Sequence, residues 1–256
     1  ATASPLAGSA ARALPADFFH LLRQQVDSTP KQALATARRL VAEQGKRLTP
    51  RQKLALRGIQ AMAHARLGDF KTGLQMGQDT LESHLGEEDD PLALAYIHNA
   101  MGRNQEGLGD IPQAMEYYLA AQGRYKAAGD QTGVATANVN IAGLFVGAGL
   151  LDKAIEEYKQ TLALLDPEKD IFLYTRILNN LAFTNTENGA PEKALSYLVQ
   201  ARKLARSMGN ELNIAYTFSN TGRAYYQPKT YEKAEKSTRL TLEKHQRQQL
   251  AHLSHA

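Results

Sequence analysis

Three asparagines recur at intervals of 40 residues, at Asn140, Asn180 and Asn220. A side-chain amide carries both a hydrogen-bond donor and an acceptor, and an extended peptide backbone offers the complementary pair. Non-covalent recognition of a peptide is therefore the chemistry that these residues could perform. Asparagine in such a position can also serve only to hydrogen-bond one helix to the next, and this structural interpretation stays open.

Patterns for covalent or metal chemistry are missing from the sequence. It has no cysteine and no HExxH, GxSxG, GxxxxGK[ST] or GxGxxG motif. His245, His252 and His255 gather near the C-terminal end, but tail histidines without carboxylate partners are seldom metal ligands. The acidic run from Gly86 lacks the spacing of a calcium loop. We expect no enzyme activity, no cofactor and no metal.

Composition narrows the class of protein further. The 256 residues are 43% hydrophobic, which is enough to bury a core. Because the 30 basic residues are scattered among 26 acidic ones, we expect no nucleic-acid partner. The uncharged run 133–151 contains two asparagines and four glycines, which would be poorly placed in lipid. We therefore expect membrane contact only through segments outside this chain.

A column of small residues recurs every 40 or 41 residues along the chain. Its members are Ala33, Gly73, Ala114, Ala154, Ala194 and Ala234. Five residues before them, four of the six positions are glycine, namely Gly68, Gly109, Gly149 and Gly189. Two helices joined by a tight turn cross closely only where side chains are small, and glycine gives the turn its backbone freedom. The pattern predicts an all-α fold built from successive helical hairpins.

The segment "NIAGLFVGAGLLDKAIEEYKQTL", which begins at Asn140, resembles the tetratricopeptide repeat, and the resemblance extends over about residues 15–242. The usual period is about 34 residues, so the longer spacing is similar to that of kinesin light chains and many bacterial regulators. HEAT and armadillo repeats share a period near 40 and stay as the alternative. The in-register small residues favour the tetratricopeptide interpretation.

This resemblance implies a right-handed superhelical solenoid of six helical hairpins followed by a C-terminal helix. The hairpins are expected to start near residues 15, 54, 95, 135, 175 and 215. We expect residues 1–14 to form a flexible tail, and residues 243–256 to form a polar helical tail or a connection to a further segment.

The resemblance also implies a concave groove lined by the first helix of each hairpin. The residues predicted to bind a peptide there are Tyr96, Asn99, Arg103, Asn140, Arg176, Asn179, Asn180, Tyr216, Asn220 and Arg223. The arginines favour a partner that is acidic or ends in a free carboxylate, unless they serve only solubility. The equivalent positions of the first two repeats are apolar and are expected in the core: Phe18, Phe19, Leu22, Ile59 and Met62.

The leading functional hypothesis is a non-catalytic module that holds a partner segment in this groove. The alternative is the periplasmic sensory input region of a bacterial membrane signalling protein, because diguanylate cyclases and histidine kinases carry arrays similar to this one. The Ala/Ser/Pro-rich start, the lack of cysteine and the polar segment 231–255 favour the alternative. A purely structural scaffold is a third hypothesis. The sequence leaves open a periplasmic or a cytoplasmic location, the ligand and the oligomeric state.

Overall fold

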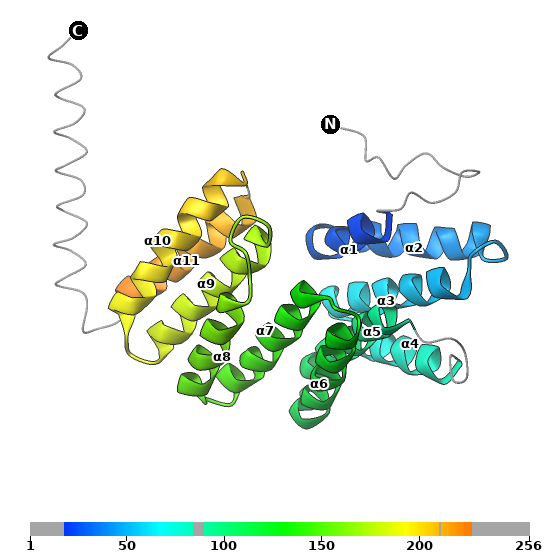
Figure 1. Ribbon diagram of the computed structural model, residues 1–256, viewed down its shortest axis with the longest axis horizontal. Coiled ribbons are helices and arrows are strands. Elements are labelled where there is room, and N and C mark those ends of the chain that lie inside the picture. The colour runs from blue at the N-terminus through cyan, green and yellow to red at the C-terminus, as the bar shows by residue number, and fades with distance from the viewer. Residues whose placement is uncertain (1–17, 84–89, 210, 227–256) are drawn as a thin grey trace, which may run out of the picture. The chain divides into compact units, whose positions relative to one another are not determined.

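The computed structural model describes residues 18–83, 90–209 and 211–226, and every regular element in these residues is an α-helix (Figure 1). The helices are α1 (Phe18–Ser28), α2 (Pro30–Gln44), α3 (Pro50–Arg66), α4 (Phe70–Ser83), α5 (Pro91–Leu108), α6 (Ile111–Ala127), α7 (Gln131–Gly147), α8 (Leu151–Ala163), α9 (Ile171–Glu187), α10 (Pro191–Ser207) and α11 (Glu211–Tyr226). The predicted all-α fold is confirmed for this part of the chain.

These residues divide into two compact units, an N-terminal unit up to Leu144 and a C-terminal unit from Phe145. In the N-terminal unit α3 packs against its hairpin partner α4 and also against α5, which packs on α4 and α6. In the C-terminal unit α9 packs against its partner α10 and also against α11. Within each unit α3 and α9 therefore contact both their own hairpin and the next one, as a hairpin solenoid requires.

Part of the expected architecture lies outside the described residues. This applies to the tails 1–14 and 243–256, the acidic run 86–89, the segment 231–255 with Ala234, and the three histidines His245, His252 and His255. The second helix of the sixth hairpin and the right-handed winding of the array stay predictions.

Side-chain caps mark where α3 and α5 begin. The helices α3, α5, α7, α9 and α11 start at 50, 91, 131, 171 and 211, each four residues before the predicted start. Thr49 Oγ1 accepts from the Gln52 amide at 3.2 Å, Gln52 Oε1 accepts from the Thr49 amide at 2.9 Å, and Pro50 follows at the first helical position. Such a capping box before proline satisfies the free amides of the first turn, so the helix begins there.

The column of small residues lies where paired helices cross. Ala33, Ala114, Ala154 and Ala194 have no exposed surface. At Gly73 a Cβ atom would collide with the amide of Asn104, which is itself buried and donates to the Ala61 and Ala100 carbonyls. The four predicted turn glycines have φ between 73° and 87°, where a side chain would be strained. The packing reason predicted for the repeat is confirmed at these positions.

Both units bury large apolar side chains, among them Ile177, Leu178 and Leu181 in the C-terminal unit. In the N-terminal unit Phe18, Leu22, Ile59 and Met62 are buried in one cluster, against which Phe19 packs, as expected for the core. In the C-terminal unit Ala182, Ala194, Leu198 and Ala224 form a cluster of mostly small side chains. No helix in the described residues is both long and apolar enough to span a membrane.

Candidate functional site

The ten predicted site residues all lie on first helices of hairpins. Tyr96, Asn99 and Arg103 belong to α5 and Asn140 to α7, within the N-terminal unit. Arg176, Asn179 and Asn180 belong to α9, and Tyr216, Asn220 and Arg223 to α11, within the C-terminal unit. The residues therefore form two sets, each built on one pair of helices.

In the N-terminal unit an amide pair joins α5 to α7. Asn140 Nδ2 donates to Asn99 Oδ1 at 2.7 Å. Asn99 is only 3% exposed, whereas Asn140 is half-buried. Because Asn99 is buried, its side-chain oxygen cannot accept a hydrogen bond from water and accepts one from Asn140 instead. This contact stabilises the packing of successive hairpins. Asn99 is a residue of the helix interface more than of the surface.

The other two predicted residues of α5 are held by neighbours. Arg103 Nη1 lies 3.8 Å from Glu106 Oε2, an oxygen that also accepts from the Tyr118 hydroxyl at 2.6 Å. Burial and the nearby Glu106 carboxylate raise the pKa of Tyr118, so its hydroxyl remains a donor. The Tyr96 ring lies 4.7 Å from the Arg23 guanidinium carbon, and Tyr96 packs against the N-terminal core cluster.

In the C-terminal unit Asn179 is the hub that joins α9 to α11. Its Nδ2 donates to the Thr175 carbonyl at 3.1 Å, and its Oδ1 accepts from Thr217 Oγ1 at 3.2 Å. Its backbone carbonyl accepts from Asn220 Nδ2 at 3.3 Å. Asn180, the next residue, is half-buried and donates through Nδ2 to the Tyr158 hydroxyl at 3.4 Å.

The three amides spaced 40 residues apart retain unused hydrogen-bonding capacity. Asn140, Asn180 and Asn220 each donate one hydrogen bond, and their side chains form no other with any residue that the structure describes. An amide offers two donors and one acceptor oxygen, so each keeps an N–H and a carbonyl. All three are half-buried, and their orientation is therefore set by the helix packing.

Two of the predicted residues of the C-terminal unit, Tyr216 and Arg223, are exposed. Arg223 Nη1 lies 3.2 Å from Glu187 Oε1, and its guanidinium lies over the Phe183 ring at 4.9 Å. Tyr216 is 57% exposed, and Arg176 is half-buried on α9. Because Arg103 and Arg223 each have a glutamate beside them, their charge is partly neutralised. The attraction of the predicted site for an acidic partner is correspondingly reduced.

A buried polar group that the sequence patterns did not indicate joins α2 to α3. His64 is 4% exposed, its Nε2 lies 3.1 Å from Arg38 Nη2 and its Nδ1 lies 2.9 Å from Asp69 Oδ2. A guanidinium can only donate, so Nε2 accepts and Nδ1 donates to Asp69. These contacts connect the first two repeats. In the described part of the chain no three carboxylate or histidine side chains gather as metal ligands would.

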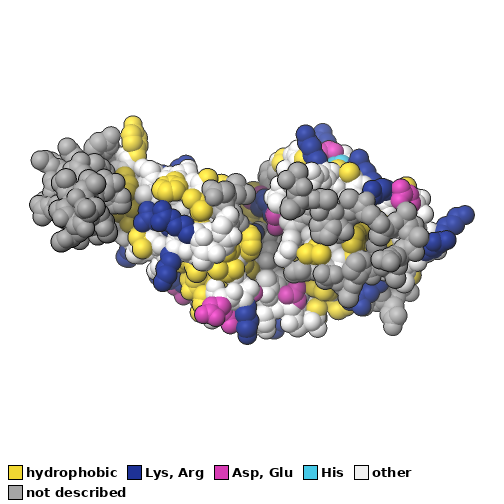
Figure 2. All heavy atoms as spheres, turned by 90° about the horizontal axis from the view of Figure 1, so that it is seen from above, with side chains coloured by type: hydrophobic (Ala, Val, Ile, Leu, Met, Phe, Trp, Pro, Cys, Tyr) yellow, Lys and Arg dark blue, Asp and Glu magenta, His cyan; other side chains and the backbone are white. Residues whose placement is uncertain are grey.

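The surface in Figure 2 has mixed charge. Lys and Arg side chains form several small groups with acidic and apolar side chains between them, and the described residues on this face offer no continuous basic patch.

No family model matches this sequence, and no curated protein matches it. Solved structures, however, share its fold. Aspartyl phosphate phosphatase F from Bacillus subtilis has a TM-score of 0.67 at 13% identity over 89% of this chain and 59% of its own. The Rap conjugation gene regulator of plasmid pLS20, solved with the Phr* peptide, has a TM-score of 0.70 at 10% identity over 85% of this chain and 60% of its own.

A third similar structure contains the TPR-like repeats of a Podospora anserina kinesin light chain. Its TM-score is 0.53 at 16% identity, and the match covers 75% of this chain and 95% of that one. The chain spans about 60% of the length of the two bacterial proteins. At these identities the likeness establishes the fold alone. The chain thus has a tetratricopeptide-like repeat fold, which resembles the folds of bacterial Rap regulators and kinesin light chain repeats.

Proposed function

We propose that this chain is a non-catalytic module that binds an extended peptide segment of a partner protein along the first helices of its hairpins. The observation that carries the proposal is the unused capacity of Asn180 and Asn220. Each amide can give one N–H and one carbonyl oxygen to a peptide backbone without breaking its present contact. Side chains of the peptide need not match, because the amides contact backbone groups.

The orientation of these amides supports binding over a merely structural role. A half-buried side chain has already lost most of its rotamer freedom, so a ligand that binds it loses less entropy than one that binds a free surface residue. The pLS20 regulator, which shares the fold, was solved with a peptide. We infer the same class of ligand for this protein.

The arginines should give the site a preference for acidic peptides. Arg176 and Arg223 flank the amides of α9 and α11, and Tyr216 adds an exposed aromatic surface. An acidic side chain or a terminal carboxylate of the peptide would compete with Glu187 for Arg223. We therefore expect charge to tune affinity modestly, and the amides to supply most of the binding energy.

A displayed library of random peptides, selected on the wild-type protein, tests this function. The enriched peptide is then titrated into wild-type protein and into an Asn180→Ala/Asn220→Ala double variant. The double variant loses four hydrogen bonds, each of which contributes about 0.5 to 1 kcal/mol, so we expect the Kd to rise by about thirtyfold to a thousandfold.

The matched control is Gln160→Ala/Gln200→Ala, which removes two exposed amides 40 residues apart from second helices of the same unit. Its Kd should equal that of the wild type. Enrichment of no peptide, or equal loss of affinity in both double variants, would contradict the proposed site. High salt should weaken peptide binding to the wild type as much as Arg176→Ala does. Such agreement would show that acidic groups of the peptide contribute to binding.

A further inference from the structure

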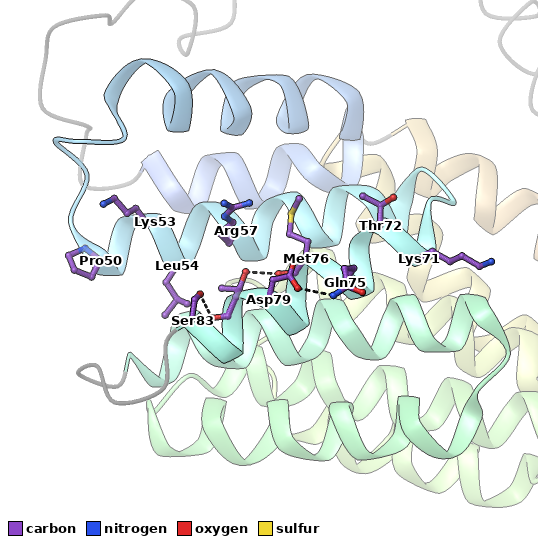
Figure 3. A pocket seen from close by; sticks show the side chains of 11 residues that line it. Pro50, Lys53, Leu54, Arg57, Lys71, Thr72, Gln75, Met76, Asp79 and Ser83 are labelled. Atoms are coloured by element: carbon purple, nitrogen blue, oxygen red, sulfur yellow. Dashed lines mark hydrogen bonds between the residues drawn. The ribbon is translucent and has the colours of Figure 1, made fainter.

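A second groove lies away from the predicted peptide site, between α3 and α4. Figure 3 shows its lining, which comes from these two helices alone and encloses about 880 Å³. Its side on α4 is formed by Thr72, Gln75, Asp79 and Ser83, which recur at helical spacing. Gly73 and Gly77 lie on the other face of α4, where Asn104 and Met101 of α5 approach them. The next hairpin therefore packs on one face of α4 and leaves this groove uncovered.

The charge of the groove is mostly positive. Lys53, Arg57 and Lys71 line it and are exposed, and in Figure 3 Arg57 lies between the two lysines along its length. None of the three side chains forms an ion pair or hydrogen bond with any described residue. Arg51, two residues before Lys53, differs because Asp90 Oδ2 lies 2.6 Å from its Nε. The single acidic lining residue, Asp79, accepts from Gln75 at 2.7 Å.

The floor and the length of the groove limit what could occupy it. Leu54 and the half-buried Met76 contribute apolar surface between the cations. Along α4 the lining runs from Lys71 to Ser83, or about 18 Å at 1.5 Å per residue. An extended peptide rises about 3.3 Å per residue, so about five residues would fit. Nucleic acid suits this place poorly, because the groove offers only three cations over about 18 Å, so few phosphate contacts would form.

We propose that the α3–α4 groove binds an acidic peptide segment of about five residues, independently of the amides on α5, α7, α9 and α11. Carboxylates of the segment pair with Lys53, Arg57 and Lys71, and its aliphatic portions lie on Leu54 and Met76. Gln75 and Thr72 supply further hydrogen-bonding groups at the wall. The groove would give the protein a second contact with an acidic partner.

The test uses an acetylated, amidated hexaglutamate peptide carrying a fluorophore, with hexaglutamine as the uncharged counterpart. Binding is measured by fluorescence anisotropy to wild-type protein, to a Lys53→Gln/Arg57→Gln/Lys71→Gln triple variant, and to Asn180→Ala/Asn220→Ala. We expect hexaglutamate to bind and hexaglutamine not to bind. Loss of three exposed charges should weaken binding by about tenfold or more, and the amide variant should bind as the wild type does.

The matched control is Lys31→Gln/Lys126→Gln/Lys159→Gln, which removes the same net charge at exposed positions outside the groove. A conservative Lys53→Arg/Lys71→Arg variant keeps both positive charges and should retain its affinity for hexaglutamate. It tests the role of charge even if the triple variant unfolds. Equal weakening by the control triple, or unchanged binding by the groove triple, overturns the proposal. So does tighter binding of a single-stranded oligonucleotide of equal charge, because it assigns the groove to nucleic acid. Loss of binding in the amide variant overturns the independence of the two sites.

Discussion

Equivalent positions of the first helices are used differently in the two units. Eleven residues before the small-residue column stand Leu22 and Met62 in the first two repeats, and Phe183 and Arg223 in the last two. Leu22 and Met62 are buried, whereas Phe183 is half-buried and Arg223 is exposed. The same backbone register therefore supplies core in one region and an accessible polar surface in the other. A repeat fixes where a residue lies along a helix, but its neighbours decide whether it is covered.

The asparagines allow a second comparison of the two units, at positions where polar residues are buried. Asn99 and Asn179 occupy one register in different units and are both buried. Both accept from the asparagine 41 residues later, Asn99 through its side chain and Asn179 through its backbone. Burial in this register is therefore common to both units, and individual repeats differ one residue further on. There Ile59 is buried, while Asn140, Asn180 and Asn220 keep part of their surface.

The largest expected effect on stability comes from placing an arginine, as found at Arg223, at the equivalent buried position of Met62. Met62→Arg would bury a cation in the N-terminal cluster without a partner, and we expect it to lower the free energy of unfolding by on the order of 3 kcal/mol. The reverse change, Arg223→Met, removes an exposed ion pair and should cost less than about 1 kcal/mol. Urea denaturation measures both. Comparable losses in the two variants would break the comparison, and Met62→Leu controls for the loss of methionine itself.

The small-residue column should behave alike in both units. Ala154→Leu and Ala194→Leu in the C-terminal unit, and Ala114→Leu in the N-terminal unit, overpack a helix crossing and should each cost about 1 to 3 kcal/mol. Thermal melting followed by circular dichroism is the measurement. Gln160→Leu, an exposed position on the same helix as Ala154, is the control and should leave the melting temperature nearly unchanged. Unchanged melting of all three alanine variants would contradict the register.

The amides should separate stability from binding. Asn140→Ala removes the 2.7 Å donor of the buried Asn99 oxygen and should cost about 1 kcal/mol or slightly more. Asn180→Ala removes only a 3.4 Å contact with Tyr158 and should cost less. Chemical denaturation of the two variants tests this order. A larger loss in Asn180→Ala would give that residue a structural role and weaken its assignment to peptide binding.

The smallest effect concerns pH and belongs to the N-terminal unit. Burial lowers the pKa of His98 below its usual 6.5, against the opposing effect of its hydrogen bond to the Leu94 carbonyl at 2.8 Å. The unfolded chain therefore takes up this proton more readily, and stability should fall as pH drops from about 6.5 through the folded pKa. Denaturation at several pH values between 5 and 7.5 measures the slope. His98→Gln should flatten it; a slope unchanged by this substitution would assign the pH dependence to other groups.

Many features of the fold could be predicted from the sequence alone. The period, the small crossing positions and the turn glycines each follow from steric requirements within one hairpin, and such requirements are local. The apolar first repeats could be assigned to the core for the same reason, since Leu22, Ile59 and Met62 have no favourable place in water. The helix starts were missed by four residues, although Thr49 and Pro50 carried a capping signal in the sequence.

Other features depended on which surfaces the fold brings together. Asn140 meets Asn99, Arg223 meets Glu187 and Phe183, and His64 meets Arg38, across separations that no short pattern encodes. The α3–α4 groove likewise exists because α5 covers one face of α4 and leaves the other open. The sequence by itself thus determined the hairpins and their stacking positions, because these depend on side-chain size and backbone freedom within each repeat. Only the tertiary structure decided which polar groups are paired and which are left to bind, because pairing depends on distances between helices.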